Sequence, residues 1–257
     1  MITSTQNPRI KHLLLLQQKS SLRREEGLFV VEGRREVEHC LAAGFRIRTA
    51  FVCEEISPLP APPLGECYIP VSPNVYERIA YRGGTEGIVA EVEARQIRLA
   101  DLRLSASPLI VVLESVEKPG NLGAVLRSAD AAGADAVVVC DPLTDLFHPN
   151  LIRSSIGAAF TMPCVACTSE ECIAFFRERG IRILTAQLQD SRLYYDTPMT
   201  GPTAIVMGTE ATGLTDQWRR AADAHIRIPM LGRLDSLNVS VSAAILLFEA
   251  VRQRQTQ

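Results

Sequence analysis

The second half of the chain alternates short apolar runs with stretches whose apolar residues recur at helical spacing. Several of the helical stretches are closed by a glycine, such as Gly133 and Gly180. The pattern predicts strands at 109–113, 136–140, 181–186, 203–207 and 225–228, and helices at 121–132, 149–157, 169–179 and 239–253. Such alternation is typical of an α/β domain, with a mostly parallel sheet that carries helices on both faces.

Two of these predicted helices carry an apolar stripe along one face. In the first helix the stripe consists of Leu122, Val125, Leu126 and Ala129. In the last helix it consists of Val241, Ala244, Ile245 and Phe248. Because residues at this spacing share one face, we expect both helices to pack on the sheet through these side chains.

The first half predicts a smaller α/β unit. Helices are expected at 11–18, at 34–43 and from Pro73 onward, and strands at 28–32, 47–52, 67–71 and 87–93. The proline-rich stretch at 57–65 is a surface loop inside this unit, because ordered patterns resume on both sides. Periodicity fades from residue 94. We therefore expect a domain at 1–95, a linker at 96–107 and a second domain at 108–257.

Composition restricts the class of protein. At 257 residues and 47% hydrophobic content the chain can bury a sizeable core. No apolar run approaches the roughly 20 residues of a membrane span, and the opening MITSTQNPRIK resembles neither a secretion signal nor a transit peptide. We expect a cytoplasmic protein without a membrane partner. Seven scattered cysteines, an odd number, fit reduced thiols better than a disulfide framework.

Charge is low overall but unevenly distributed. A net charge of −2 and a pI near 6.1 argue against extensive coating of nucleic acid. Residues 1–50 hold nine Lys/Arg against five Glu, a local charge of +4 that leaves −6 for the rest. This fits an RNA-facing end and, equally, a solvated basic helix. The candidate RNA contacts are Arg9, Lys11, Arg23, Arg24, Arg34 and Arg35.

Four short polar or glycine-containing segments lie beside the apolar strands of the second half. They are NLGAVLR at 121–127, GTEATGL at 208–214, IPM at 228–230 and SLNVS at 236–240. When several such loops follow one another closely along a chain, they usually form a binding or catalytic site. Gly208 follows a strand and would permit close approach of a ligand to the backbone, although a plain strand-end turn also explains it. Arg127 lies about 140° around its helix from Leu122, off the apolar stripe, as an exposed helical arginine would.

In this order, the four segments resemble the signature motifs of the SpoU-type (TrmH-like) RNA ribose 2′-O-methyltransferases of the SPOUT superfamily, over about residues 108–252. The stretches ITSTQNPRIK and LFVVEGRREVEHCLAAG are similar to the RNA-binding domain that precedes many such catalytic domains, whose fold is shared with certain ribosomal proteins. The resemblance implies a C-terminal trefoil knot, a homodimer with a site built across its two-fold interface, and S-adenosylmethionine as cofactor.

The resemblance also assigns roles to individual residues. It implies that Arg127 is catalytic, that Asn121 positions it, and that Glu210 supports the donor pocket. The polar active-site residues correspond to Ser236 and Asn238, and the cofactor contacts correspond to Gly208, Ile228, Met230 and Leu237. A guanidinium with a pKa above about 12 is normally no base. We therefore expect Arg127 to orient the ribose and to stabilise the alkoxide that forms on it.

Signatures of other enzyme classes are missing from the sequence. There is no GxGxxG dinucleotide loop and no GxxxxGK[ST] phosphate loop. The pair Cys164 and Cys167, with Cys172 nearby, lacks a second pair at ligand spacing, and the four histidines form no metal pattern, so we expect no metal. Trp218 and the pair Tyr194 and Tyr195 are expected to serve in packing.

The sequence thus predicts a SAM-dependent RNA ribose 2′-O-methyltransferase that works as a homodimer. Ribosomal RNA is favoured over transfer RNA as substrate because the attached N-terminal domain is more typical of enzymes that act on rRNA. One alternative is a non-catalytic RNA-binding factor that kept the fold, against which the intact set of polar site residues weighs. Base methylation by the same fold is a further alternative, and the ribose-type motifs weigh against it.

Overall fold

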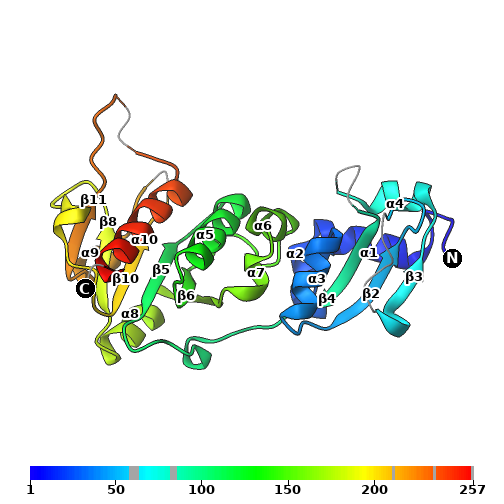
Figure 1. The fold of residues 1–257 in the computed structure, drawn as a ribbon, viewed down its shortest axis with the longest axis horizontal. Helices are drawn as coiled ribbons and strands as arrows, with labels where there is room; N and C mark the ends of the chain where they lie inside the picture. Colours follow the sequence, from blue (N-terminus) through cyan, green and yellow to red (C-terminus); the bar gives the residue numbers. More distant parts are fainter. Residues whose placement is uncertain (58–63, 82–85, 210–211, 234–235, 256–257) are drawn as a thin grey trace. The chain divides into compact units, whose positions relative to one another are not determined.

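A computed structural model describes residues 1–57, 64–81, 86–209, 212–233 and 236–255. The chain forms two compact units (Figure 1). Unit 1 contains Met1–Arg95 and Phe147–Phe160, and unit 2 contains Gln96–Leu146 and Thr161–Gln257. The segment Phe147–Phe160 lies in the region that the sequence pattern assigns to the second domain, but its contacts group it with unit 1.

Unit 2 is built on a seven-stranded sheet in the order β7-β6-β5-β10-β8-β11-β9. The strands are β5 (Leu109–Glu114), β6 (Ala136–Cys140), β7 (Cys164–Cys167), β8 (Arg182–Ala186), β9 (Arg192–Leu193), β10 (Thr203–Met207) and β11 (Ala224–Arg227). Every described pairing in it is parallel. Every residue of the central strands β5 and β10 is buried, as expected for a parallel sheet covered on both faces. The predicted α/β class is confirmed.

The helices of unit 2 are α5 (Pro119–Ala131), α8 (Ser169–Glu178), α9 (Asp216–Ala221) and α10 (Val239–Gln255), with 3₁₀ turns at Leu99–Asp101 and Tyr194–Asp196. The α5 stripe of Leu122, Val125, Leu126 and Ala129 is buried as predicted. A capping box between Thr168 and Glu171 starts α8. Trp218 of α9 is fully buried and donates its indole N–H to Ser169 Oγ at 2.9 Å, so it serves in core packing.

The predicted stripe of α10 is wrong. The buried residues of this helix are Ala243, Leu246, Leu247 and Ala250. Val241 and Phe248, which the prediction placed on the sheet, are 47% and 49% exposed. The middle of α10, residues 243–248, is apolar at every position, so periodicity alone does not select a face, and packing against α5 decides which side chains are buried.

Unit 1 holds a four-stranded sheet in the order β1-β4-β2-β3. The strands are β1 (Leu28–Glu32), β2 (Ile47–Val52), β3 (Tyr68–Pro70) and β4 (Ile88–Glu93). The helices are α1 (Pro8–Gln18), α2 (Ser20–Glu26), α3 (Arg34–Ala42), α4 (Pro73–Ile79) and α6 (Pro149–Ser155), and a 3₁₀ turn lies at Gly65–Cys67. The short helix α7 (Ala158–Thr161) includes residues of both units. The β1–β4 and β4–β2 pairs are antiparallel and β2–β3 is parallel. Phe147 stacks on Phe29 of β1 at 4.7 Å between ring centroids.

The helix predicted at 149–157 ends at Ser155 in the structure, and α7, which the sequence pattern missed, follows from Ala158. The break falls at Ile156 and Gly157, whose φ angles of 52° and 93° lie in the left-handed region and end α6. The sequence pattern also missed α2, α9 and the short strands β7 and β9, because segments this short carry little periodicity. Across the described ranges, no helix combines the length and apolarity needed to cross a bilayer.

Candidate functional site

A hollow in unit 2 lies at the carboxyl ends of the neighbouring strands β5 and β10. Its lining consists of Leu113, Glu114, Val116, Glu117, Lys118, Asn121, Gly208, Thr209 and Val239. From β5 the chain runs outward to β6 and β7, and it then returns to β8 on the other side of β10. The hollow therefore lies where the strand order reverses, which is where open α/β sheets bind their ligands.

Gly208 connects β10 to the loop that forms one wall of the hollow. Thr209 and Gly213 exchange two backbone hydrogen bonds, of 3.2 and 3.1 Å. A Cβ atom on Gly208 would lie 2.2 Å from the carbonyl carbon of Gly213 and 2.5 Å from the nitrogen of Leu214. The glycine is therefore required by the close approach of the loop's own backbone.

The far end of this loop is fixed to β5 by Glu114. This carboxylate is 3% exposed and accepts hydrogen bonds from the backbone N–H and the hydroxyl of Thr215, at 2.9 and 2.6 Å. Thr215 in turn precedes α9 as its N-cap. Periodicity and motifs did not indicate the importance of Glu114, although an acidic residue at the end of an otherwise apolar strand is a sign of such a role.

Two predicted site residues meet across 117 residues of sequence. The side-chain amide of Asn238 donates to Asn121 Oδ1 at 3.2 Å. Asn238 Oδ1 accepts hydrogen bonds from the N–H and the hydroxyl of Ser240, at 2.9 and 2.7 Å, in the first turn of α10. The starts of α5 and α10 are thereby joined at the hollow, which Asn121 and Gly208 line directly.

Among the described residues, the lining of the hollow does not include the other predicted site residues of unit 2. Arg127 is exposed and, six residues after Asn121, stands about 9 Å farther along α5. Ile228 and Met230 are half-buried beyond β11, and Ser236 and Leu237 are exposed. The stretch after β11 runs outward from unit 2 (Figure 1), and its Leu231 is 97% exposed. Glu210 lies outside the described residues.

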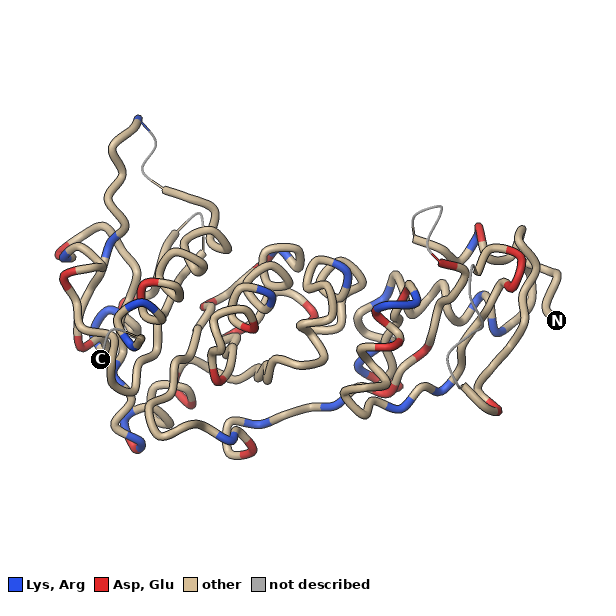
Figure 2. The backbone as a smooth tube through the Cα atoms, viewed as in Figure 1, with Lys and Arg blue, Asp and Glu red and all other residues tan. Residues whose placement is uncertain are grey.

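The basic residues proposed for RNA contact differ in their availability. Arg23 is 3% exposed, and its guanidinium donates to the backbone carbonyls of Leu16 and Gln17. It therefore stabilises the end of α1 and is too buried to contact a phosphate. Arg34 and Arg35 pair with Glu38 and Glu36, at 2.7 and 2.8 Å. Figure 2 shows acidic and basic positions close together along unit 1. The exposed candidates are Arg9, Lys11, Arg24 and Arg35.

The cysteine arrangement differs from the one that the sequence suggested. Cys167 lies beside Cys140 and Cys172, and the three sulfur atoms are within 4.8 Å of one another, whereas Cys164 is not part of this group. Among the residues that the structure describes, no histidine joins a group at metal-binding spacing.

Known proteins match both parts of the chain. The profile of the SpoU rRNA Methylase family matches residues 108–248, and that of the MRM3-like substrate binding domain matches residues 7–90. The Pseudomonas putida 23S rRNA (guanosine-2′-O-)-methyltransferase RlmB is 38% identical over 182 residues, which are 68% of this chain and 73% of that protein. The Bacillus subtilis 23S rRNA (guanosine(2553)-2′-O)-methyltransferase RlmP is 28% identical over 96% of this chain and 97% of its own.

Solved structures are similar over nearly the whole length. An AdoMet-bound rRNA methyltransferase from Sinorhizobium meliloti has a TM-score of 0.89 at 30% identity, covering 98% of this chain and 97% of that chain. An RNA 2′-O ribose methyltransferase crystal structure has a TM-score of 0.85 at 39% identity, covering 99% of both chains.

Proposed function

The chain belongs to the SpoU rRNA methylase family, and we propose that it transfers the methyl group of S-adenosylmethionine to a ribose 2′-hydroxyl of ribosomal RNA. The observation that carries the proposal is the meeting of Asn121, Asn238 and Gly208 at the switch point between β5 and β10. The relatives named for 23S rRNA support ribosomal over transfer RNA. The paired asparagines weigh against a non-catalytic RNA-binding factor, since such a factor needs no polar group at this place.

The lining of the hollow fits S-adenosylmethionine. Val116 and Val239 offer apolar surface to a purine, while Asn121 and the backbone at Gly208 offer hydrogen-bonding groups. When bound, this cofactor supplies an electrophilic methyl group on a sulfonium. We assign Ile228, Met230 and Leu237, from the stretch after β11, to the enclosure of the donor.

The polar residues are proposed to position the ribose. The hydrogen bond from Asn238 holds Asn121 in one orientation, so that Asn121 presents a fixed amide toward the substrate. Arg127 orients the ribose and stabilises the negative charge that develops on its 2′-oxygen, because preorganised charge lowers the barrier most where new charge forms. Ser236 and Glu210 are assigned supporting polar roles.

A homodimer accounts for the distance between Arg127 and the hollow. Arg127 is exposed and does not line the hollow of its own chain, as far as the described residues extend. Val241 and Phe248 form an apolar face of α10 that is about half exposed in one chain, at 47% and 49%. We propose that this face is buried in a two-fold interface and that Arg127 of one protomer serves the hollow of the other. The trefoil knot stays a prediction.

Unit 1 is proposed to bind RNA, in keeping with the match of residues 7–90 to a substrate binding domain. The phosphate contacts are assigned to Arg9, Lys11 and Arg24, with Arg34 and Arg35 exchanging their glutamate partners for phosphate. Each such contact releases counterions, so affinity should fall steeply with salt. We propose a cytoplasmic location for this activity.

The catalytic assignment is tested with Arg127→Ala. We expect methyl transfer to slow by about 10²- to 10⁴-fold, while S-adenosylmethionine affinity, measured by calorimetry in EDTA, changes by no more than a few fold. Leu237→Asp should weaken cofactor binding first. Arg219→Ala is the control, because within the described part of the chain Arg219 forms an exposed surface pair with Asp216 at 3.8 Å. An Arg127→Ala protein that methylates at the parent rate would remove Arg127 from the site.

Complementation tests the shared site. In a 1:1 mixture of Arg127→Ala and Asn121→Ala chains, half of the dimers combine one chain of each kind. If Arg127 serves the opposite hollow, one of the two sites in such a dimer is intact, and about a quarter of wild-type activity returns. If each hollow uses its own Arg127, the mixture stays inactive. Phe248→Glu should yield monomers by light scattering.

A further inference from the structure

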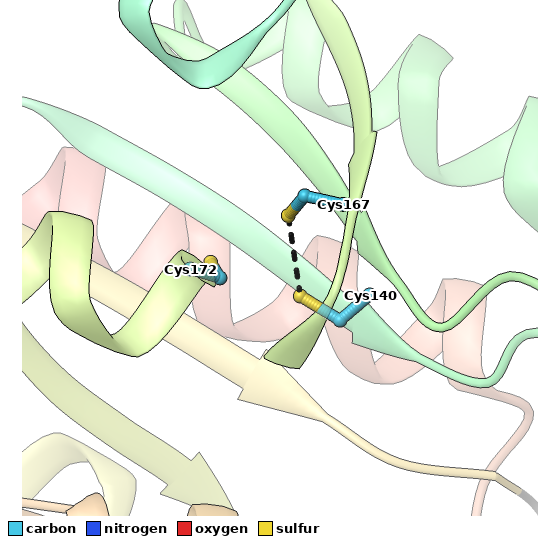
Figure 3. Close-up of side chains that lie close together, drawn as sticks. All are labelled: Cys140, Cys167 and Cys172. Carbon is cyan, nitrogen blue, oxygen red and sulfur yellow. Dashed lines mark hydrogen bonds between the residues drawn. The ribbon is translucent and has the colours of Figure 1, made fainter. Parts of the chain in front are cut away.

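Three thiols from three elements of unit 2 converge at the carboxyl edge of its sheet (Figure 3). Cys140 ends β6, Cys167 ends the neighbouring strand β7, and Cys172 faces them from α8. The Sγ atoms of Cys140 and Cys167 are 4.0 Å apart, and Cys172 Sγ lies within 4.8 Å of both. Cys140 and Cys167 are direct partners in the parallel register.

The three thiols differ in their access to solvent. Cys140 and Cys172 are fully buried among Ile110, Val138 and Phe176. Cys167 is half-buried and packs against the edge of this core. A small polar reagent in water therefore reaches Cys167 first.

The surroundings of Cys167 favour its thiolate. Hydrogen bonds from Cys140 and Cys172 hold the pKa of Cys167 below its ordinary value, and they outweigh burial and the negative charges of Glu171 and Asp141. Cys167 also directly precedes Thr168, the N-cap of the ten-residue helix α8, whose positive end stabilises a nearby anion. The pKa of Cys140 is raised, first by its hydrogen bond to Cys167, so Cys140 keeps its proton.

We propose that Cys167 is a site of oxidation by peroxides and that Cys140 resolves the oxidised sulfur into an intrachain disulfide. The Cys167 thiolate attacks one peroxide oxygen, so that an S–O bond forms, the O–O bond breaks, and hydroxide leaves. Cys140 then attacks the sulfenic sulfur. The S–S bond forms, the S–O bond breaks, and the departing hydroxide takes the Cys140 proton as water. Two thiols and one hydrogen peroxide yield one disulfide and two waters.

The strand register makes the disulfide reachable. Neighbouring strands lie about 4.8 Å apart, which falls within the spacing of about 4.4 to 6.8 Å that disulfide-bonded Cα atoms adopt. Closing the bond brings the Sγ atoms from 4.0 Å to about 2.05 Å, which rotation about the two Cα–Cβ bonds can supply. The third thiol, Cys172, assists as a hydrogen-bond donor and is not consumed. This oxidation chemistry does not depend on the proposed methyl transfer.

The test treats the reduced full-length protein with equimolar hydrogen peroxide in EDTA, blocks the remaining thiols with N-ethylmaleimide, and maps peptides by mass spectrometry. Two of the seven thiols should be lost, as a cross-link between the peptides of Cys140 and Cys167, and dithiothreitol should restore them. Because this peptide map is made on the wild-type protein, its result does not depend on whether a cysteine variant folds. A link from Cys167 to Cys172, or first oxidation at another cysteine, would overturn the proposal.

Variants separate the two steps. Cys167→Ser should abolish the cross-link, and a chain carrying both Cys140→Ser and Cys172→Ser should hold a sulfenic acid at Cys167 that dimedone traps. Cys164→Ser is the matched control: it lies on the same strand, and burial raises the pKa of its thiol to about 12, so the cross-link should form unchanged. One zinc ion retained per chain without EDTA, with all three thiols protected from alkylation, would make the cluster a metal site and overturn the oxidation proposal.

Discussion

Gly208→Ala tests whether the loop after β10 shapes the cofactor site. The added Cβ would stand 2.2 Å from the Gly213 carbonyl carbon and 2.3 Å from its oxygen. Both are backbone atoms, so no side-chain rotation relieves the clash. Restoring an ordinary contact of 3.4 Å requires the two segments to separate by about 1.2 Å, the difference between 2.2 and 3.4 Å.

This separation would break the two hydrogen bonds between Thr209 and Gly213, which measure 3.1 and 3.2 Å. At about 0.5 to 1.5 kcal/mol of net free energy for each bond, the loss is about 1 to 3 kcal/mol. Overpacking a close contact costs about the same. If the loop stays closed, the cost lowers the unfolding free energy. If it opens, the cost weakens S-adenosylmethionine binding by about 5- to 150-fold, since about 1.4 kcal/mol is a factor of ten.

Two measurements on the same preparations distinguish these outcomes. Urea denaturation detects a lower unfolding free energy, and calorimetric titration detects weaker binding of S-adenosylmethionine. Gly201→Ala is the control, because Gly201 precedes the same strand and no described heavy atom lies within 4 Å of its added Cβ. It should change stability by less than about 0.5 kcal/mol. Wild-type affinity together with wild-type stability in Gly208→Ala would refute the steric argument.

Two further predictions concern stability. Arg254 donates to the carbonyls of Ser107, Pro108, Met199 and Gly201. Arg254→Ala should therefore lower the unfolding free energy by about 2 to 4 kcal/mol in urea denaturation. Arg219→Ala, which breaks an exposed pair with Asp216, should cost less than about 1 kcal/mol, and equal losses in the two variants would contradict the prediction. For His12, burial lowers the pKa, but the hydrogen bonds and charges of Glu91 and Glu26 outweigh it and raise the pKa above 6.5. The stabilisation that protonated His12 provides should be complete below pH 6.5 and should disappear as pH rises through the raised pKa. Urea denaturation at a series of pH values should therefore show a fall in the unfolding free energy over this range, and His12→Gln should lack that fall.

Local pattern was enough to place most elements of this protein. The stripe at Leu122, Val125, Leu126 and Ala129 predicted the buried face of α5, because the remaining positions of that helix are small or polar. The order of the apolar strands indicated the parallel sheet, and the resemblance of the loop motifs to a known family identified the chemistry. These features depend on neighbours within one helical turn or one strand, whose spacing the sequence displays directly.

Only the tertiary structure decided which distant residues meet. It paired Asn121 with Asn238 over 117 residues, and it paired Cys167 with Cys140 over 27 residues although Cys164 is three residues away. It also turned Val241 and Phe248 outward, and it explained Gly208 by the approach of Gly213. Periodicity states which side chains share a face, but strand register and helix packing determine what that face contacts, because these arise from the fit of whole elements to one another.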